Sequence, residues 1–324
     1  MTNIMLNQEE FQIIQNLKKK FQANPDEFRN ALTGFYHQKG VNYWDYLQLE
    51  ILLNLQQTKT DFDDEMIFIV YHQITELYFK LILHELEKLT CLERKEFLHA
   101  ENWIKRIGRV VNYCHKVTDS FNIMQPGEAG KPNQFLSKGE FLQFRNALVP
   151  ASGFQSVALR KIEFYATSLY QLLHPQVLNK YSPLNTIEEL YEGLYWKFGG
   201  WITESGRRKE KSKTLEAFEK KYDKTLIELA HSLKERNLYF LFFQYQPQNK
   251  ADQQVLQLIT NNQDIRNLLY EFDYEINQRW KTIHFSVISR QMENEEKGTG
   301  GTNWKEYLPP QNQQICYFPQ LRKK

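Results

Sequence analysis

The feature that most constrains the fold is a stretch of 26 residues that is apolar on almost every side of a helix. It runs from Asp64 to Leu89 with the sequence DEMIFIVYHQITELYFKLILHELEKL, and its apolar residues recur at helical spacing. One broad face is predicted to comprise Phe68, Tyr71, Ile74, Thr75, Tyr78, Leu81, Ile82 and Leu86, with Ile67, Ile69, Val70, Leu77 and Leu83 filling much of the rest. A helix with so wide an apolar surface needs protein around it, so the sequence predicts a buried central helix.

A second long helix of this kind is predicted from about residue 263 to residue 292. Its inward side chains are expected to be Ile265, Leu268, Leu269, Phe272, Ile276, Trp280, Ile283, Val287 and Ile288. Shorter helices are predicted near residues 8–22, 41–57, 101–122, 138–148, 153–174, 184–196, 213–234 and 252–260. No convincing alternating strand pattern accompanies them. The sequence therefore predicts an all-α fold, a helical bundle built around long central helices.

The composition supports this fold class. The chain of 324 residues contains only 14 Gly and 10 Pro, fewer than in average usage, so tight turns are few and barrels and sandwiches are disfavoured. Aromatic residues make up 14% of the chain, which is enough for a sizeable core. A net charge of +2 creates no overall field for nucleic acid or an anionic membrane. The basic stretch 206–213 is interpreted as a solvated loop or the start of a helix.

The cysteines and the N-terminus indicate where the protein works. Cys91, Cys114 and Cys316 show no metal or redox spacing, and their odd number argues against a disulfide framework. The first residues, MTNIMLNQEEFQ, lack a charged start followed by an apolar run. No stretch approaches the roughly 20 apolar residues of a membrane span. We therefore expect a cytoplasmic protein with no membrane and no nucleic acid among its partners.

Two of the eight histidines stand out, because His72 and His284 lie in the middle of the two long apolar helices. No histidine pair has zinc-ligand spacing, and the common hydrolase, kinase and dehydrogenase motifs do not occur in the sequence. Burying an imidazole without a partner costs about 1–3 kcal/mol, so each needs a backbone carbonyl, a carboxylate or a metal. A haem iron is one such metal, and it suits His284 better, since Trp280 lies one turn before it and Phe285 beside it.

Three aromatic residues each precede a polar residue by four positions, and residues at this spacing are neighbours on a helix face. The pairs are Phe68 and His72, Phe141 and Arg145, and Trp280 and His284. Together they offer two imidazoles, a guanidinium and flat apolar walls, which an aromatic ligand with a carboxylate requires. Arg145 would hold the carboxylate with two hydrogen bonds; the alternative is a surface charge on a short helix.

A glycine-rich stretch, KGTGGT (297–302), directly follows the second long helix. Its glycines allow unusual backbone angles, so its amides and the Thr299 hydroxyl can approach a ligand. It is either a flexible linker or a loop that folds over whatever His284 binds.

Several of these segments resemble one known family, that of tryptophan 2,3-dioxygenase, a haem enzyme. The matching blocks are YWDYLQLEILLNLQ (43–56), DEMIFIVYHQITELYFKLILHELE (64–87), FRNALVPASGFQS (144–156), RWKTIHFSVISRQM (279–292), KGTGGT (297–302) and YFPQL near the C-terminus. They occur in the family's order over roughly residues 41–321. The resemblance implies a single all-α domain over residues 1–324 that encloses a haem pocket. It would comprise an N-terminal helical extension (1–40), a family-like core (41–321) and a charged surface insertion (206–224).

The resemblance also implies a cofactor site. His284 would be the proximal ligand of the iron of haem b, which is ferrous in the active form, and Trp280 would lie against the haem. Ser152 and Gly153, in the PASG segment, would lie near the haem and the bound O₂.

The implied substrate site uses the remaining motif residues. His72 would be the catalytic distal histidine and would bind the indole N–H, while Phe68 would pack against the indole ring. Arg145 would pair with the substrate carboxylate, Phe141 would line the pocket beside it, and Thr299 would contact the ammonium and carboxylate groups.

Two tyrosines near the N-terminus have a different implied role. Tyr43 and Tyr46 match residues that reach the pocket from a neighbouring subunit in the family, so the N-terminal segment would make subunit contacts in a homotetramer. The residue between them that is usually Gly in the family is Trp44 here.

The implied reaction inserts both atoms of O₂ across the indole C2–C3 bond of L-tryptophan and gives N-formyl-L-kynurenine, the first step of tryptophan catabolism by the kynurenine pathway. The alternative within enzymes is a haem-dependent oxygenase or hydroxylase of another indole or aromatic amino acid. Outside enzymes, the alternatives are a non-catalytic haem or tryptophan sensor, or a helical scaffold without a cofactor. The scaffold would leave His72 and His284 unexplained.

Overall fold

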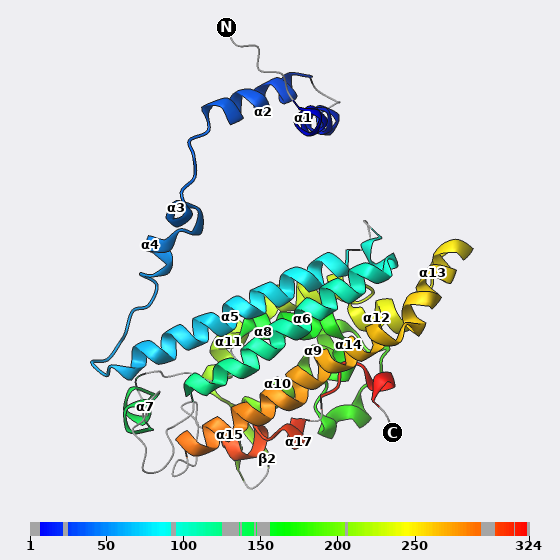
Figure 1. Cartoon of the computed structure of the whole chain (residues 1–324). Coiled ribbons are helices and arrows are strands. Elements are labelled where there is room, and N and C mark those ends of the chain that lie inside the picture. The colour runs from blue at the N-terminus through cyan, green and yellow to red at the C-terminus, as the bar shows by residue number, and fades with distance from the viewer. Residues whose placement is uncertain are drawn as a thin grey trace. The chain divides into compact units, whose positions relative to one another are not determined.

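The computed structural model describes residues 7–21, 25–91, 95–124, 136, 138–145, 147, 156–204, 207–292, 302–313 and 315–322 (Figure 1). The chain forms two compact units, Met1–Gln56 and Gln57–Lys324. Helices dominate both units, so the predicted all-α class is confirmed. The predicted extension of residues 1–40 and core of residues 41–321 stay predictions.

The N-terminal unit contains α1 (Gln8–Lys20), α2 (Pro25–His37), α3 (Tyr43–Leu47) and α4 (Leu49–Leu52). A capping box starts α1, because the side chain of Asn7 accepts from the backbone N–H of Glu10, and the Glu10 carboxylate accepts from that of Asn7. The single helix predicted over 41–57 is wrong, since Gln48 adopts a left-handed conformation (φ 53°) that separates α3 from α4. The sequence patterns did not predict α2.

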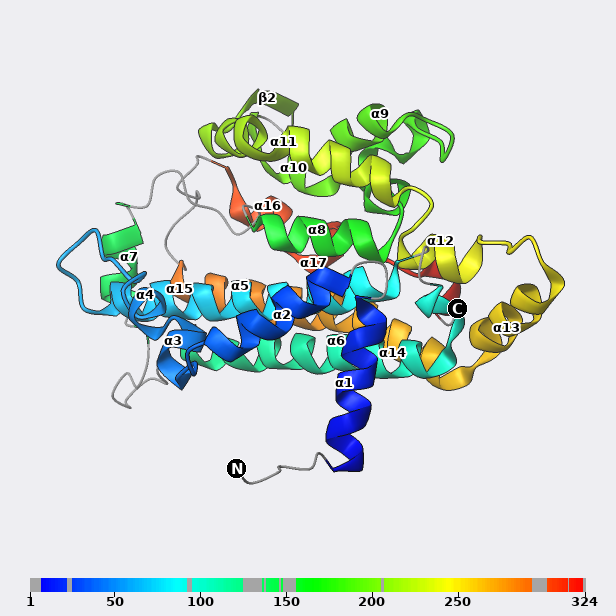
Figure 2. The same cartoon turned by 90° about the horizontal axis from the view of Figure 1, so that it is seen from above.

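The long helices of the larger unit lie alongside one another (Figure 1). They are α5 (Asp64–Leu89), α6 (Ala100–Ser120), α14 (Gln263–Tyr274) and α15 (Lys281–Gln291). In Figure 2, α8 (Val157–Ala166) lies between α5 and α11 (Lys213–Leu233), and it packs against both. The other elements are η2 (Glu96–Leu98), η3 (Phe121–Met124), α7 (Lys138–Arg145), η5 (Leu169–Leu172), η6 (Pro175–Lys180), α9 (Ile187–Glu192), α10 (Tyr195–Gly199), β1 (Trp201–Glu204), β2 (Arg207–Lys211), α12 (Leu238–Phe243), α13 (Lys250–Asn261), η7 (Glu275–Trp280), α16 (Trp304–Tyr307), α17 (Pro310–Gln313) and η8 (Pro319–Leu321).

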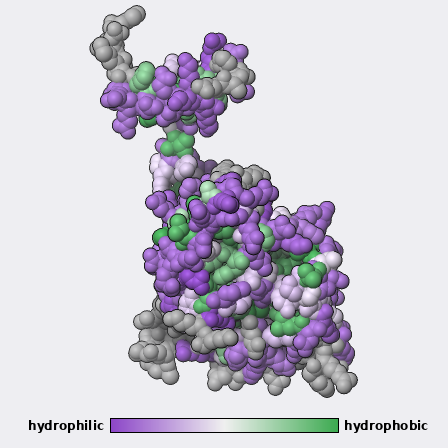
Figure 3. Space-filling view, turned by 90° about the vertical axis from the view of Figure 1, so that its right-hand side faces the viewer, coloured by the Kyte–Doolittle hydropathy of each residue, from purple (hydrophilic) through white to green (hydrophobic). Residues whose placement is uncertain are grey.

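Helix α5 has the predicted bounds, but only part of its surface is buried. Its buried apolar residues, Tyr71, Phe79, Ile82, Leu86 and Leu89, contribute to the hydrophobic cores. The prediction that it is enclosed on nearly all sides is wrong, because an apolar stripe of Met66, Val70, Leu77 and Leu81 is exposed. These residues share one helical face, and the unit covers the opposite face. Figure 3 shows separate apolar patches among hydrophilic residues on one side of the molecule.

By length and hydropathy alone, α5 is also the one helix among the described residues that could cross a membrane. The sequence patterns did not predict a segment of this kind. In the structure α5 packs along α6 and α8, and it carries two buried carboxylates, Glu65 and Glu85. The core helix of a bundle satisfies the same criteria of length and hydropathy.

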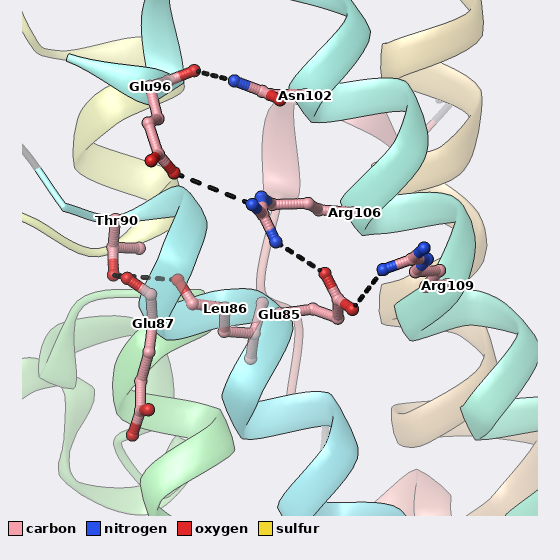
Figure 4. A network of polar contacts seen from close by, with 8 residues as sticks. All are labelled: Glu85, Leu86, Glu87, Thr90, Glu96, Asn102, Arg106 and Arg109. Atoms are coloured by element: carbon pink, nitrogen blue, oxygen red, sulfur yellow. Dashed lines mark hydrogen bonds and ion pairs between the residues drawn. The ribbon is translucent and has the colours of Figure 1, made fainter. Parts of the chain in front are cut away.

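A buried carboxylate of α5 forms hydrogen bonds with two arginines of α6 (Figure 4). Glu85 accepts hydrogen bonds from Arg106 and Arg109, both at 2.9 Å, and Arg106 also lies 3.7 Å from Glu96. A buried carboxylate without such partners would be strongly destabilising, so these contacts favour a single alignment of α5 against α6.

A short antiparallel hairpin interrupts the helical pattern. Strands β1 and β2 pair with Trp201 opposite Lys211, and the register shifts between Ile202 and Thr203. The interpretation of residues 206–213 as a loop is therefore wrong for β2, because a charged strand shows no alternation and depends on its pairing partner. The start of a helix is confirmed at Ser212, whose side chain accepts from the backbone N–H of Leu215 at the beginning of α11.

The second long helix, predicted as one α-helix over 263–292, is interrupted by a segment of π-helix. Helix α14 continues through η7, which is π-helical, into α15. A π-helical turn holds more residues than an α-helical turn, so it changes the direction in which all later side chains point. The change falls directly before the segment that contains His284.

Candidate functional site

A pair of stacked aromatic rings lies where η7 meets α15. Trp280 ends η7, and its ring lies 5.4 Å from that of His284 with 9° between the planes. Phe121 of η3 contacts both, with ring centroids 6.1 Å from Trp280 and 5.7 Å from His284. The imidazole is thus held between two aromatic neighbours from different elements.

His72 occupies the middle of α5, and its ring nitrogen Nδ1 lies 2.7 Å from the backbone oxygen of Phe68. A carbonyl oxygen only accepts, so Nδ1 carries the proton and Nε2 keeps its lone pair. The side chain is accessible to solvent, yet it lies deep enough among protein atoms that desolvation lowers its pKa. His72 is therefore neutral at pH 7 and can accept a hydrogen bond through Nε2.

His284 is neutral as well. Desolvation lowers its pKa to about 4, and the nearby His72 adds to the lowering. Neutral imidazole is the form that binds a metal, so the surroundings of His284 favour the protonation state of a metal ligand.

A continuous series of ring contacts joins the two histidines to α7. In order, the rings are Phe141, Phe68, His72, Tyr71, Phe121, His284 and Trp280. Successive ring centroids are 6.1, 4.0, 5.1, 5.5, 5.7 and 5.4 Å apart. The structure therefore brings together all three aromatic–polar pairs, which are up to 212 positions apart in the chain as numbered.

Arg145 lies in the last turn of α7, which packs against α5 and α15. Its side chain is only 9% exposed, and the neighbouring Phe141 and Phe144 are buried. The alternative of a surface charge is therefore wrong. A guanidinium is buried at the aromatic end of the site, where it can bind a carboxylate with two hydrogen bonds.

The site surrounds a hydrophobic cluster that is separate from the main core of the unit. Its buried members come from α5, η3, α7, α15, α16 and the residues that flank them, and include Tyr71, Phe121, Leu136, Phe141, Phe144, Val287 and Trp304. Phe68 and Trp280 pack against this cluster. The aromatic residues therefore form an apolar cluster between the elements that carry His72, Arg145 and His284.

A cavity of about 350 Å³ opens beside His284, a volume within the usual range of small-molecule sites. It is lined by residues of η6, α8, α10, η7, α15, α16 and α17 and by their flanking residues: Arg160, His174, Gln176, Tyr195, Trp196, Phe198, Gly199, Trp201, Trp280, Lys281, His284, Asn303, Glu306, Tyr307, Leu308, Asn312 and Gln313. Its walls are thus rich in aromatic rings with a smaller number of polar groups.

Four buried nitrogen atoms of the cavity walls have no hydrogen-bond partner among the described residues. They are Nε of Arg160, Nε1 of Trp196, Nε1 of Trp280 and Nζ of Lys281. All are hydrogen-bond donors. Nothing in the sequence indicated Arg160, Trp196 or Lys281, because a lone charged or aromatic residue has no spacing pattern.

Other predicted site residues are not placed at this site. Tyr43 and Tyr46 lie on α3 in the N-terminal unit, where they are 69% and 77% exposed, and their role stays a prediction. Ser152, Gly153 and Thr299 lie outside the described residues. Among the residues described, no group of three or more His, Cys, Asp and Glu side chains could hold a metal ion.

The fold and the site define an all-α protein with a ring-lined interior that presents two neutral histidines and a buried arginine. The chain is similar to the tryptophan 2,3-dioxygenase family, whose sequence model matches residues 29–173. It is 27% identical to the tryptophan 2,3-dioxygenase of Shewanella woodyi over 93% of this chain and 94% of that protein.

Shorter stretches of the chain are more similar to other tryptophan 2,3-dioxygenases. The chain is 38% identical to the tryptophan 2,3-dioxygenase of Sorangium cellulosum over 44% of this chain and 33% of the relative. It is 39% identical to that of Exiguobacterium sibiricum over 39% of this chain and 42% of the relative. High similarity is thus confined to part of the chain, whereas the lower similarity extends over nearly all of it.

Proposed function

We propose that this protein is a haem-dependent dioxygenase that inserts both atoms of O₂ across the C2–C3 bond of L-tryptophan and gives N-formyl-L-kynurenine. The observation that carries the proposal is the neutral His284, stacked on Trp280 beside a cavity and joined by ring contacts to His72 and the helix of Arg145. The similarity of the chain to tryptophan 2,3-dioxygenases supports this activity.

The described residues fit a haem. His284 offers the neutral imidazole that would hold the iron, and the porphyrin would supply the remaining nitrogen ligands, so one protein ligand would be sufficient. The cavity walls are aromatic, and their unpartnered donors match a flat molecule that bears carboxylates. When bound, ferrous haem b supplies the oxygen chemistry of the reaction, and the protein supplies binding, orientation and exclusion of water.

The substrate would be read at two polar positions by described residues. The guanidinium of Arg145 would pair with the carboxylate of L-tryptophan, since it is buried at the end of α7. The Nε2 lone pair of His72 would accept the indole N–H, because Nδ1 is already committed to the backbone of Phe68. Phe68 and Phe141 would flank the indole, and orientation between these groups would remove the entropic cost of aligning the reactants.

We propose further that the protein is a cytoplasmic homo-oligomer, a homotetramer, in which the N-terminal unit makes subunit contacts. The exposed large apolar residues of the described part of that unit support this: Phe11, Ile13, Leu32, Phe35, Tyr36, Val41, Tyr43, Trp44, Tyr46, Leu47, Ile51, Leu52, Leu53 and Leu55. So much exposed apolar side chain is typical of an interaction surface. Tyr43 and Tyr46 would complete the pocket of a neighbouring subunit.

The activity is tested on protein expressed with iron and 5-aminolevulinate, reduced without oxygen and then given L-tryptophan and O₂. We expect the absorbance of N-formyl-L-kynurenine to increase with time. With isotopically labelled O₂, mass spectrometry should show both labelled oxygen atoms in the product. Hydroxylated product, or turnover only with another aromatic amino acid, would favour the alternative oxygenase or hydroxylase. Protein that binds no haem under these conditions would refute the proposal.

A further inference from the structure

Lys281 is the first residue of α15 and lines the same cavity as His284. Its side chain is 4% exposed, and its ammonium nitrogen has no hydrogen-bond partner among the described residues. The closest aromatic contact is the ring of Tyr195, whose centroid lies 4.6 Å from Nζ. A cation–π contact contributes much less to stability than a charged hydrogen bond. The ammonium group of Lys281 is therefore buried without a hydrogen-bond acceptor that would offset its loss of water.

The acids near Lys281 already have other partners. Glu163 accepts from Arg160 at 2.9 Å and from the hydroxyl of Tyr195 at 2.5 Å. Both the arginine and the carboxylate are buried, so their charges balance each other.

The second nearby acid is Asp273, and it is occupied as well. It accepts from the side chain of Asn277, from the backbone N–H of Tyr317 and from the thiol of Cys316, and Arg322 lies 3.7 Å away. Glu163 and Asp273 therefore leave Lys281 without a bonded counter-charge. Burial lowers the pKa of Lys281 to about 7, which is the expected result of desolvation without a close anion.

The partner that is missing must accept hydrogen bonds. Lys281 shares the cavity with the unpartnered nitrogens of Trp280, Trp196 and Arg160, and these too only donate. A cavity whose unsatisfied groups are all donors, and whose walls are aromatic, matches a flat molecule with carboxylates at its edge. In the proposed reaction, both L-tryptophan and the haem are flat and bear carboxylates. The carboxylate of L-tryptophan is assigned to Arg145, which does not line this cavity, so the haem is the group that matches it.

We propose that Lys281 pairs with a carboxylate of the haem that His284 holds, and so orients the cofactor in the cavity. This inference rests on the proposed function. Lys281 and His284 lie three positions apart at the start of α15, so one helix would bind the iron and the acidic edge of the same molecule.

The test compares haemin with its dimethyl ester, which has the same ring and iron but no free carboxylate. Haem-free protein is titrated with each compound and binding is followed by absorbance, in the unchanged chain and in Lys281→Met, Lys281→Arg and Lys80→Met. Lys80 is an exposed residue of α5 and serves as the matched control. We expect Lys281→Met to weaken haemin binding about 10- to 100-fold and to leave ester binding unchanged. Lys281→Arg should retain most of the affinity for haemin, and Lys80→Met should retain all of it.

Thermal unfolding of the haem-free proteins separates binding from a structural role. Lys281→Met removes a buried, unpartnered ammonium, so its Tm should equal or exceed that of the unchanged chain. Equal loss of affinity for haemin and its ester, together with a lower Tm, would overturn the inference and assign Lys281 a structural role. Unchanged haemin binding by Lys281→Met would overturn the inference alone and leave the proposed function standing. Failure of the unchanged chain to bind either compound would refute both.

Discussion

The rings of Trp280 and His284 are nearly parallel across the boundary between η7 and α15. The angle between the ring planes is 9°, and the ring centroids are 5.4 Å apart. Their spacing of four residues places both on one helix face, and the contact of Phe121 with both rings limits their movement. An imidazole held in this way has its orientation set before any ligand binds. Such preorganisation reduces the entropic cost of binding.

Replacement of His284 by Ala is expected to abolish most haem retention while the helical content is kept. The reason is that His284 is the only described residue assigned to the iron. Purified protein should lose its Soret band, and circular dichroism should remain unchanged. His231→Ala is the control, because His231 is exposed and pairs with Glu188 at 2.7 Å. Full haem occupancy in His284→Ala would assign the iron ligand to another residue.

Replacement of Arg145 by Ala is expected to raise KM for L-tryptophan by a factor on the order of 10–1000, because a charged hydrogen-bonded pair contributes about 1.5–3 kcal/mol or more. Steady-state kinetics would measure the change. Tryptamine, which has no carboxylate, should show nearly the same kinetics in both proteins. Arg290→Ala, at an exposed position of α15, is the matched control. Equal KM values for L-tryptophan would show that the carboxylate binds elsewhere.

Replacement of His72 by Ala is expected to lower kcat/KM for L-tryptophan, because Nε2 would no longer accept the indole N–H. The loss should be about 10-fold or more, the effect of removing one good hydrogen bond. With 1-methyl-L-tryptophan, which has no N–H to donate, the variant and the unchanged chain should be similar. If the variant loses the same factor with both compounds, the hydrogen bond is not the role of His72.

Lys281 should make the haem-free protein more stable as the pH rises above 7, until the thiols of Cys114 and Cys316, whose pKa values burial raises above 9, begin to act in the opposite direction. The pKa of Lys281 is about 7 in the folded protein, whereas an ordinary lysine, as in the unfolded chain, has a pKa of 10.5. Between these values the unfolded chain therefore binds more protons than the folded protein. The free energy of unfolding therefore rises with pH, by about 1.4 kcal/mol for each unit of pKa difference. Urea unfolding at several pH values would measure the slope.

In Lys281→Met the increase in stability just above pH 7 should largely disappear. Lysines with ordinary pKa values contribute equally to the folded and unfolded chains, so they add no slope. The same slope in both proteins would show that another group causes it.

Deletion of Gln278 from η7 is expected to abolish haem binding while the helices remain. Removing one residue of the π-helical segment rotates everything after it by about 100°, and His284 would leave the face that it shares with the cavity. Haem titration and circular dichroism would measure the two outcomes. The substitution Gln278→Ala, which keeps the backbone length, should bind haem normally. Normal binding by the deletion variant would mean that the π-helix does not set the direction of His284.

Much of the architecture could be predicted, because it depends on local periodicity. Helix α5 begins and ends where its apolar pattern predicts, and α6 and α11 lie within about two residues of their predicted bounds. The family was also recognisable, because its motifs are local strings of residues. The hairpin β1–β2 was missed, since its second strand is charged and depends on pairing with the first. The break at Gln48 was missed because Gln has no special preference for a left-handed backbone.

In the candidate site, too, some features follow from the sequence and others only from the folded structure. The sequence by itself determined which helices carry His72, Arg145 and His284, and that each has an aromatic residue one turn before it. Only the tertiary structure decided that Arg145 is buried, and that Lys281 lies in the cavity of His284 without an acceptor. The physical reason is that helix position depends on near neighbours in the chain. Burial and pairing depend on residues from α8, α10 and η3, which approach only when the chain is folded.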